Sequence, residues 1–148
     1  MSGFIVNIDV DDLERAIAFY TRAFELTVGR SFGDGAIGVE LVGSSTPIYV
    51  LVKAAGTRPA PGARPALARD YDRHWTPVHL DFLVEDIRAA AARVEAAGAR
   101  RESEVETHGY GLFAQFADPF GNGFCLIQFV GGGYDAIADA SAPASPRT

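Results

Sequence analysis

The fold is decided by a pattern that the chain carries twice, as IVNIDVDDLERAIAFYTRAFEL at residues 5–26 and as HLDFLVEDIRAAAARVEAAGA at residues 79–99. The run Val10–Leu13 aligns with Val84–Ile87, and in this register His79 falls on Ile5. Each copy passes from a segment of alternating apolar residues into a helix preceded by acidic capping residues. Two copies of one supersecondary unit predict a duplicated βαβββ module.

The first copy predicts a strand over residues 4–10 and a helix capped by Asp11 or Asp12. Three strands are predicted near 28–32, 36–42 and 47–53. In the first strand, Asn7 and Asp9 point away from the face that carries its apolar partners. Tyr20 belongs to the buried stripe of the helix, with its hydroxyl expected to find a surface partner.

The second copy repeats this plan with a strand over residues 78–84. His79 and Asp81 lie on one face of that strand, and Leu80 and Phe82 on the other. Asp86 is the candidate cap of the following helix, and Gly98 its left-handed terminator. Strands are predicted near 101–106, 112–117 and 123–130.

These elements divide the chain into a first module at 1–53, a connector at 54–77, a second module at 78–130 and a flexible tail at 131–148. The connector has no periodicity, and loops of this length are often functional or mobile. Its end, Asp72–Trp75, differs in composition and could pack over a pocket. The tail is rich in Gly, Ala, Ser and Pro and is expected to be disordered.

Composition excludes several classes of function. The chain has 48% hydrophobic and 22% charged residues and a formal net charge of −6, as in a globular protein without a basic stripe for nucleic acid. No apolar run approaches the length of a membrane span. Cys125 is the only cysteine, so no intrachain disulfide can form, and a reducing cytoplasm is the simplest location.

The second copy ends in a distinctive turn, Asp118-Pro119-Phe120-Gly121-Asn122, before the last strand. Together with the Val-Asp-Asp-Leu-Glu-Arg run and His79-Leu80-Asp81-Phe82, this turn makes the chain resemble the vicinal oxygen chelate superfamily over residues 4–130. That superfamily includes glyoxalase I, bleomycin-resistance proteins and extradiol dioxygenases. The resemblance implies an α+β fold in which two βαβββ modules form a curved, cup-shaped mixed sheet, and it implies a homodimer.

The resemblance also implies positions for the metal ligands of the metal-dependent members. The second-module histidine matches His79, whereas its first-module counterpart is Ile5, which cannot bind a metal. The final-strand glutamate falls at Cys125 and the first-module glutamate near Tyr49, or at Leu51 if that register slips. His79 and Cys125 alone make an incomplete site. We therefore expect neither the usual metal centre nor another cofactor.

The polar residues of the predicted inner faces are the candidate ligand-binding residues. An antiparallel sheet with one solvated face would also explain them, but a cup makes that face concave. His79 could equally be a structural histidine, and Cys125 a small apolar residue of a buried strand. The roles of His74, Trp75, His108 and Tyr110 stay open between pocket lining and loop anchoring. The candidate ligand-binding residues are Asn7, Asp9, Glu40, Tyr49, His79, Asp81, Gln115 and Cys125.

The leading functional hypothesis is a protein that binds a small hydrophobic or aromatic molecule, with sequestration by bleomycin-resistance relatives as the nearest model. The alternative is a lyase, isomerase or dioxygenase with a rearranged metal site or with metal-free acid–base chemistry at His79 and Asp81. The sequence does not decide whether a reaction is catalysed. Nor does it decide whether the cup closes within one chain or between two.

Overall fold

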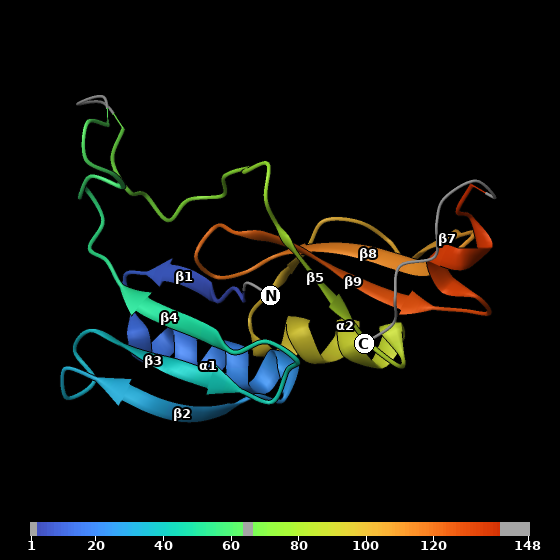
Figure 1. The fold of residues 1–148 in the computed structure, drawn as a ribbon, viewed down its shortest axis with the longest axis horizontal. Coiled ribbons are helices and arrows are strands. Elements are labelled where there is room, and N and C mark those ends of the chain that lie inside the picture. Colours follow the sequence, from blue (N-terminus) through green and yellow to red (C-terminus); the bar gives the residue numbers. More distant parts are fainter. Residues whose placement is uncertain (1–2, 64–66, 140–148) are drawn as a thin grey trace.

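The predicted duplication is confirmed by the computed structural model, which describes residues 3–63 and 67–139 as two modules that each contain a sheet and a helix (Figure 1). The first sheet has the order β1-β4-β3-β2, in which β1 is parallel to β4 and the other pairs are antiparallel. The first module consists of β1 (Val6–Val10), α1 (Leu13–Phe24), β2 (Thr27–Phe32), β3 (Gly38–Val42) and β4 (Ile48–Val52).

The second sheet repeats this order as β5-β9-β8-β6, with β7 also paired to β8. Again the first strand of the module is parallel to the last, and the remaining pairs are antiparallel. The fold is therefore α+β with two mixed sheets, as expected. The second module consists of β5 (Leu80–Leu83), α2 (Ile87–Ala97), β6 (Arg100–Arg101), β7 (Glu106–His108), β8 (Gly111–Ala117) and β9 (Gly123–Phe129).

The prediction of one continuous strand near 101–106 is wrong. Two short strands, β6 and β7, form there, and the residues between them are not in a strand. Ser103 interrupts the pairing with β8. Its backbone N–H shares the carbonyl of Gln115 with the N–H of Glu102, and its hydroxyl accepts from the N–H of Gln115. A serine side chain that bonds to nearby backbone in this way competes with the regular ladder.

Both helices begin, and α2 ends, as the sequence predicts. The Asp12 carboxylate accepts from the N–H of Arg15 at 2.9 Å, which decides between Asp11 and Asp12 as the cap of α1. The Asp86 carboxylate accepts from the N–H groups of Arg88 and Ala89, both at 3.0 Å. Gly98 ends α2 at φ 119, a left-handed conformation that glycine adopts without steric cost.

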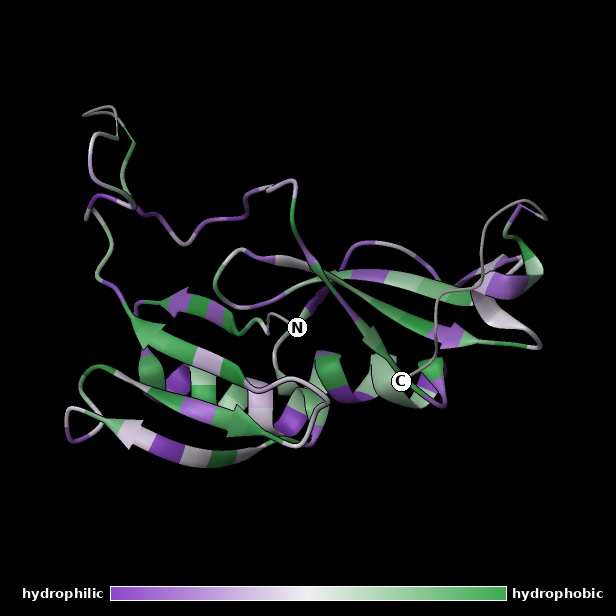
Figure 2. Ribbon diagram, viewed as in Figure 1, coloured by the Kyte–Doolittle hydropathy of each residue, from purple (hydrophilic) through white to green (hydrophobic). Residues whose placement is uncertain are grey.

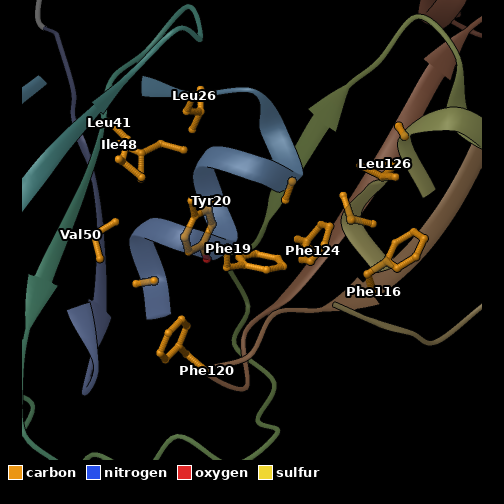
Figure 3. Close-up of a cluster of buried hydrophobic side chains, with 14 of the residues drawn as sticks. Phe19, Tyr20, Leu26, Leu41, Ile48, Val50, Phe116, Phe120, Phe124 and Leu126 are labelled. Atoms are coloured by element: carbon orange, nitrogen blue, oxygen red, sulfur yellow. The ribbon is translucent and has the colours of Figure 1, made fainter. Parts of the chain in front are cut away.

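The two modules share one hydrophobic core, because α1 and α2 pack against each other and side chains of α1 reach β9. Phe19 of α1 points toward Phe124 of β9, with ring centroids 6.4 Å apart (Figure 3). Phe124 also contacts the rings of Phe24, Phe82 and Phe116. This cluster ties the first module to the second.

Tyr20 corrects an expectation, because its hydroxyl is buried and not at the surface. It donates to a carboxylate oxygen of Asp118 at 2.5 Å. That carboxylate is 6% exposed and also accepts from the N–H of Phe120 and from the backbone and side-chain amides of Asn122. The Asp118 carboxylate thus stabilises its own turn through Phe120 and Asn122 and also links that turn to α1 through Tyr20.

Each sheet has one face covered by helix and one face without a helix. Apolar and polar residues alternate along β1 and β3, as the hydropathy colours show (Figure 2). The sheets are open and curved, and the edge strands β1 and β5 are not paired with each other. Within the described residues, no helix has the length and apolarity that a membrane span requires.

The connector runs from β4 to β5 along one side of both modules and is bonded to each (Figure 1). Arg69 donates to Asp9 of β1 at 2.8 Å, and Arg73 donates to Glu102 of the second module at 2.7 Å. The Tyr71 hydroxyl donates to the carbonyl of Lys53. These bonds hold residues 69–73 of the connector against both modules.

The expectation of disorder from Gly131 onward does not describe residues 131–139. Gly133–Ala136 form a 3-10 turn, and Tyr134 contacts the rings of Phe129 at 4.8 Å and Tyr110 at 5.1 Å. The N–H of Val130 also donates to the carbonyl of Tyr110. The glycine-rich composition predicted a free tail, but contacts with Tyr110 of the β7–β8 hairpin and Phe129 of β9 hold this turn against the second sheet. Residues 140–148 lie outside the described residues.

Candidate functional site

The helix-free face of the second sheet gathers three of the candidate residues in one row. Asp81 of β5, Cys125 of β9 and Gln115 of β8 are direct register partners across three adjacent strands. The alternation of the strands places them on the same face, opposite the helix-facing Leu80 and Phe82. His79 precedes β5 by one residue and belongs to the same face as Asp81.

His79, Asp81 and Cys125 form a compact cluster. The Nε2 atom of His79 lies 3.2 Å from a carboxylate oxygen of Asp81, and the side chains are 35% and 37% exposed. One donor atom from each of the three residues lies within 4.8 Å of the others. Burial and the neighbouring Asp81 carboxylate raise the pKa of the Cys125 thiol to about 12, so it is protonated at neutral pH. It is therefore a poor nucleophile.

Aromatic side chains flank this cluster at both ends. Trp75 lies beside His79, with ring centroids 5.6 Å apart. At the other end, the ring of Tyr110 stacks on His108 at 5.2 Å, and His108 meets Phe113 edge to face. The pKa of Tyr110 is raised, first by burial and then by Tyr134, Asp81 and Cys125, so the β7–β8 hairpin approaches the cluster. A ligand on this face would contact both polar groups and rings.

A cavity of about 510 Å³ opens between the unpaired strands β1 and β5 and is adjacent to this cluster. Its polar lining includes Asn7, Asp9 and His79, and Arg69 and His74 of the connector close one side. Its apolar lining comes from Val6, Ile8, Leu80, Phe82 and Phe124. The cavity thus combines apolar walls with polar and charged groups that could orient a ligand, as small-molecule sites do.

Glu40 and Tyr49 lie together on the first sheet and are already bonded. The guanidinium of Arg30 donates to both carboxylate oxygens of Glu40 at 2.8 and 2.9 Å, and to the Tyr49 hydroxyl at 2.6 Å. The Tyr49 hydroxyl donates in turn to Glu40 at 3.0 Å. The hydrogen bonds from Arg30 lower the pKa of Glu40 to about 2. Glu40 therefore stays ionised across physiological pH.

The eight candidate residues thus form three groups. His79, Asp81, Gln115 and Cys125 gather on the second sheet, Asn7 and Asp9 join His79 at the cavity, and Glu40 and Tyr49 pair on the first sheet. A single cup holding all eight stays a prediction. The sequence reasoning missed Arg30 and Arg69, since nothing local marks an arginine that bonds a carboxylate far along the chain.

Residues 5–127 match the family model described as a glyoxalase-like domain. The chain belongs to the glyoxalase-like domain family. Solved structures agree at the level of fold. FosX, a genomically encoded fosfomycin resistance protein from Listeria monocytogenes, superposes with a TM-score of 0.66 at 17% identity, over 88% of this chain and 93% of that chain. TioX from Micromonospora sp. ML1 superposes with a TM-score of 0.62 at 16% identity, over 88% of this chain and 100% of that chain.

A third similar structure is the hypothetical protein SA1046 from S. aureus, with a TM-score of 0.62 at 16% identity over 86% of this chain and 97% of that chain. No curated protein matches the chain. The glyoxalase-like domain belongs to the vicinal oxygen chelate superfamily, which confirms the resemblance. The fold expected from that resemblance is likewise confirmed.

The residues present do not fit the four-ligand metal centre that the superfamily implies. Ile5 has no donor atom. The Tyr49 hydroxyl is held by Arg30 and Glu40, and the Cys125 thiol keeps its proton. Of the four inherited positions, only His79 keeps the residue type that the resemblance implies.

We accordingly expect the purified protein to contain no stoichiometric divalent metal. A resident metal stabilises a fold by its binding free energy, so removing one lowers the melting temperature. Elemental analysis after purification without a metal-affinity column, and melting with and without chelator, check this. One metal per chain together with a chelator-induced fall in melting temperature would contradict it.

Proposed function

We propose that this glyoxalase-like domain binds a small, partly aromatic or hydrophobic molecule on the helix-free face of the second sheet and in the adjoining cavity, without a resident metal. The observation that supports this most is the cluster of His79, Asp81 and Cys125 between aromatic side chains on an uncovered sheet face. Sequestration of a toxic compound is the nearest functional model, and FosX is named as a resistance protein. The lone Cys125 favours a cytoplasmic location.

The exposure of these groups argues against a purely structural role. A buried histidine bonded on both nitrogens would be a core residue, whereas the His79 side chain is 35% exposed and bonded to one carboxylate. Trp75 is 62% exposed beside it. Exposed apolar and polar groups gathered on one concave surface are typical of binding sites.

Replacing His79 with alanine should weaken ligand binding while changing stability little. The change deletes one hydrogen bond to the ligand, worth about 0.5–1.5 kcal/mol of binding free energy. A thermal-shift screen of planar aromatic and aliphatic small molecules identifies binders, and titration of wild type and His79→Ala compares their affinities.

Glu95→Ala is the control, because Glu95 lies on α2, away from the helix-free face, and its side chain, 37% exposed, forms an ion pair with Arg101 at 3.0 Å. It should retain most of the affinity. If His79→Ala instead unfolds the protein, His79 is a core residue. If His79→Ala leaves affinity untouched, the binding site lies elsewhere.

An enzyme of the lyase, isomerase or dioxygenase type is the second candidate. Two observations favour it: the donor atoms of His79, Asp81 and Cys125 lie within 4.8 Å, and Asp81 lies 3.2 Å from the imidazole, as an orienting carboxylate for a general base would. Turnover of any bound compound that is lost in Asp81→Asn would favour the enzyme. Binding without turnover favours sequestration.

We further propose that the protein is a homodimer. The strands β1 and β5 present unpaired edges, and exposed apolar side chains lie near them: Phe4 at 77%, Val78 at 81% and Leu83 at 65%. Unpaired edges with apolar neighbours favour association. Light scattering at micromolar concentration should give twice the chain mass, and a monomer mass would contradict the proposal.

A further inference from the structure

The last residues of the connector are fixed to the second module by an ion pair. The Nε and Nη2 atoms of Arg73 donate to the two carboxylate oxygens of Glu102 at 2.7 and 2.8 Å. The side chains are 26% and 20% exposed, so the pair is largely shielded from water. Bidentate arginine–carboxylate pairs fix orientation as well as distance. Arg100 adds a second hydrogen bond to Glu102 at 3.0 Å.

The backbone of the turn at 118–123 is shaped to receive this segment. The N–H of His74 donates to the carbonyl of Gly121 at 3.1 Å. A side chain at Gly121 would lie 1.9 Å from the carbonyl oxygen of Asp72, and a side chain at Gly123 would lie 2.8 Å from the guanidinium of Arg73. Gly121 is therefore required for the backbone of the connector to lie so close, and a side chain at Gly123 would displace the guanidinium of Arg73.

Trp75 follows directly after this fixed segment. Within the described residues, no contact of its ring anchors the connector to either module. Its ring contact within the described residues is with His79, at 5.6 Å and 35°. The connector is anchored instead by Arg69, Tyr71 and Arg73. A tryptophan that is 62% exposed beside the candidate site is available for stacking by another ring.

We propose that Trp75 is the wall on which a planar aromatic ligand stacks, and that the Arg73–Glu102 pair is the positioning device that holds it beside His79. The proposal rests on the proposed binding function and names its ligand class: a planar ring with a hydrogen-bond donor for Asp81. Stacking favours flat rings through dispersion and the indole quadrupole, and the neighbouring carboxylate favours a donor group. Arg73 itself does not contact the ligand, since its donors are used by Glu102, His74 and Gly121.

The test uses 2-aminoquinoline as the planar probe and cyclohexylamine as the non-planar control, titrated by ligand-observed NMR. Trp75→Leu should lower the affinity for 2-aminoquinoline by about three- to tenfold, and Trp75→Phe should recover part of it. Neither variant should change binding of cyclohexylamine. Because Trp75 is exposed, neither should change the melting temperature by much.

Glu102→Gln tests the positioning role. It should lower the fluorescence anisotropy of Trp75, the single tryptophan of the chain, and lower the affinity for 2-aminoquinoline several-fold. Arg100→Gln is the matched control, because it removes the other partner of Glu102 and leaves Arg73 in place. It should change neither property.

The outcomes separate the two proposals. If His79→Ala loses 2-aminoquinoline but Trp75→Leu binds like wild type, the binding function stands and the stacking wall is overturned. If no planar probe binds, while an aliphatic compound raises the melting temperature of wild type but not of His79→Ala, the planar ligand class is overturned and the binding function stands. If Glu102→Gln behaves like Arg100→Gln, Trp75 is not positioned by the ion pair.

Discussion

Replacing Asp118 with alanine is expected to destabilise the protein by about 3–5 kcal/mol, because several buried donors lose their acceptor at once. The donors are the Tyr20 hydroxyl, the N–H of Phe120 and both amides of Asn122, at 2.5–2.9 Å. Hydrogen bonds to charged groups contribute about 1.5–3 kcal/mol each and are not additive. Urea unfolding followed by circular dichroism measures the loss.

Tyr20→Phe is the companion variant, because it removes one of these donors without leaving a cavity. It should cost about 1.5–3 kcal/mol, less than Asp118→Ala. A loss below about 1 kcal/mol for Asp118→Ala would show that water replaces the lost acceptor.

The hydrogen bond between Tyr20 and Asp118 should also make the stability of the protein depend on pH in the alkaline range. Burial, followed by the charge and hydrogen bond of Asp118, raises the pKa of Tyr20 well above 10. The folded state therefore holds the phenol proton more tightly than the unfolded state. This contribution is complete below pH 10, the ordinary pKa of tyrosine, and is lost as the pH rises above it. Tyr20→Phe should flatten that alkaline decline, as unfolding midpoints between pH 8 and 11 would show.

Phe124→Ala should also cost about 3–5 kcal/mol, through a cavity at the junction of the modules. The ring is 4% exposed and contacts rings from α1, β5 and β8. Chemical denaturation of the variant measures the loss.

Phe4→Ala is the control for ring removal, since Phe4 is 77% exposed and its loss should stay within about 0.5 kcal/mol. A small effect of Phe124→Ala, or two separate unfolding transitions in the wild type, would mean that the modules do not share one core.

The elements that could be predicted from the sequence are those with local causes. Alternation identifies β1 and β5, and the helix caps Asp86 and Gly98 act within one turn of their own helix. The facing of His79 and Asp81 follows from the same alternation, because a strand turns successive side chains to opposite faces.

What could not be predicted depends on contacts between distant segments. Tyr20 and Asp118 are 98 residues apart, and no local pattern shows that a tyrosine in a buried stripe will find a carboxylate from the other module. The position of Trp75 depends on Arg73 meeting Glu102, which is fixed by tertiary packing. The contact of Tyr134 with Tyr110 could not be predicted, because the glycines that precede Tyr134 are typical of a flexible tail.

The pairing of each first strand with the last strand of its module has a consequence for folding kinetics. Val6 must find Ile48, and Leu80 must find Phe124, before either sheet is complete. Closing such long loops costs chain entropy in advance of the contacts that compensate it, and parallel pairing slows folding further. Each module should therefore assemble its antiparallel hairpins early and add its opening strand late. In refolding experiments, substitutions in β1 or β5 should mainly accelerate unfolding, whereas those in the β8–β9 hairpin should mainly slow folding.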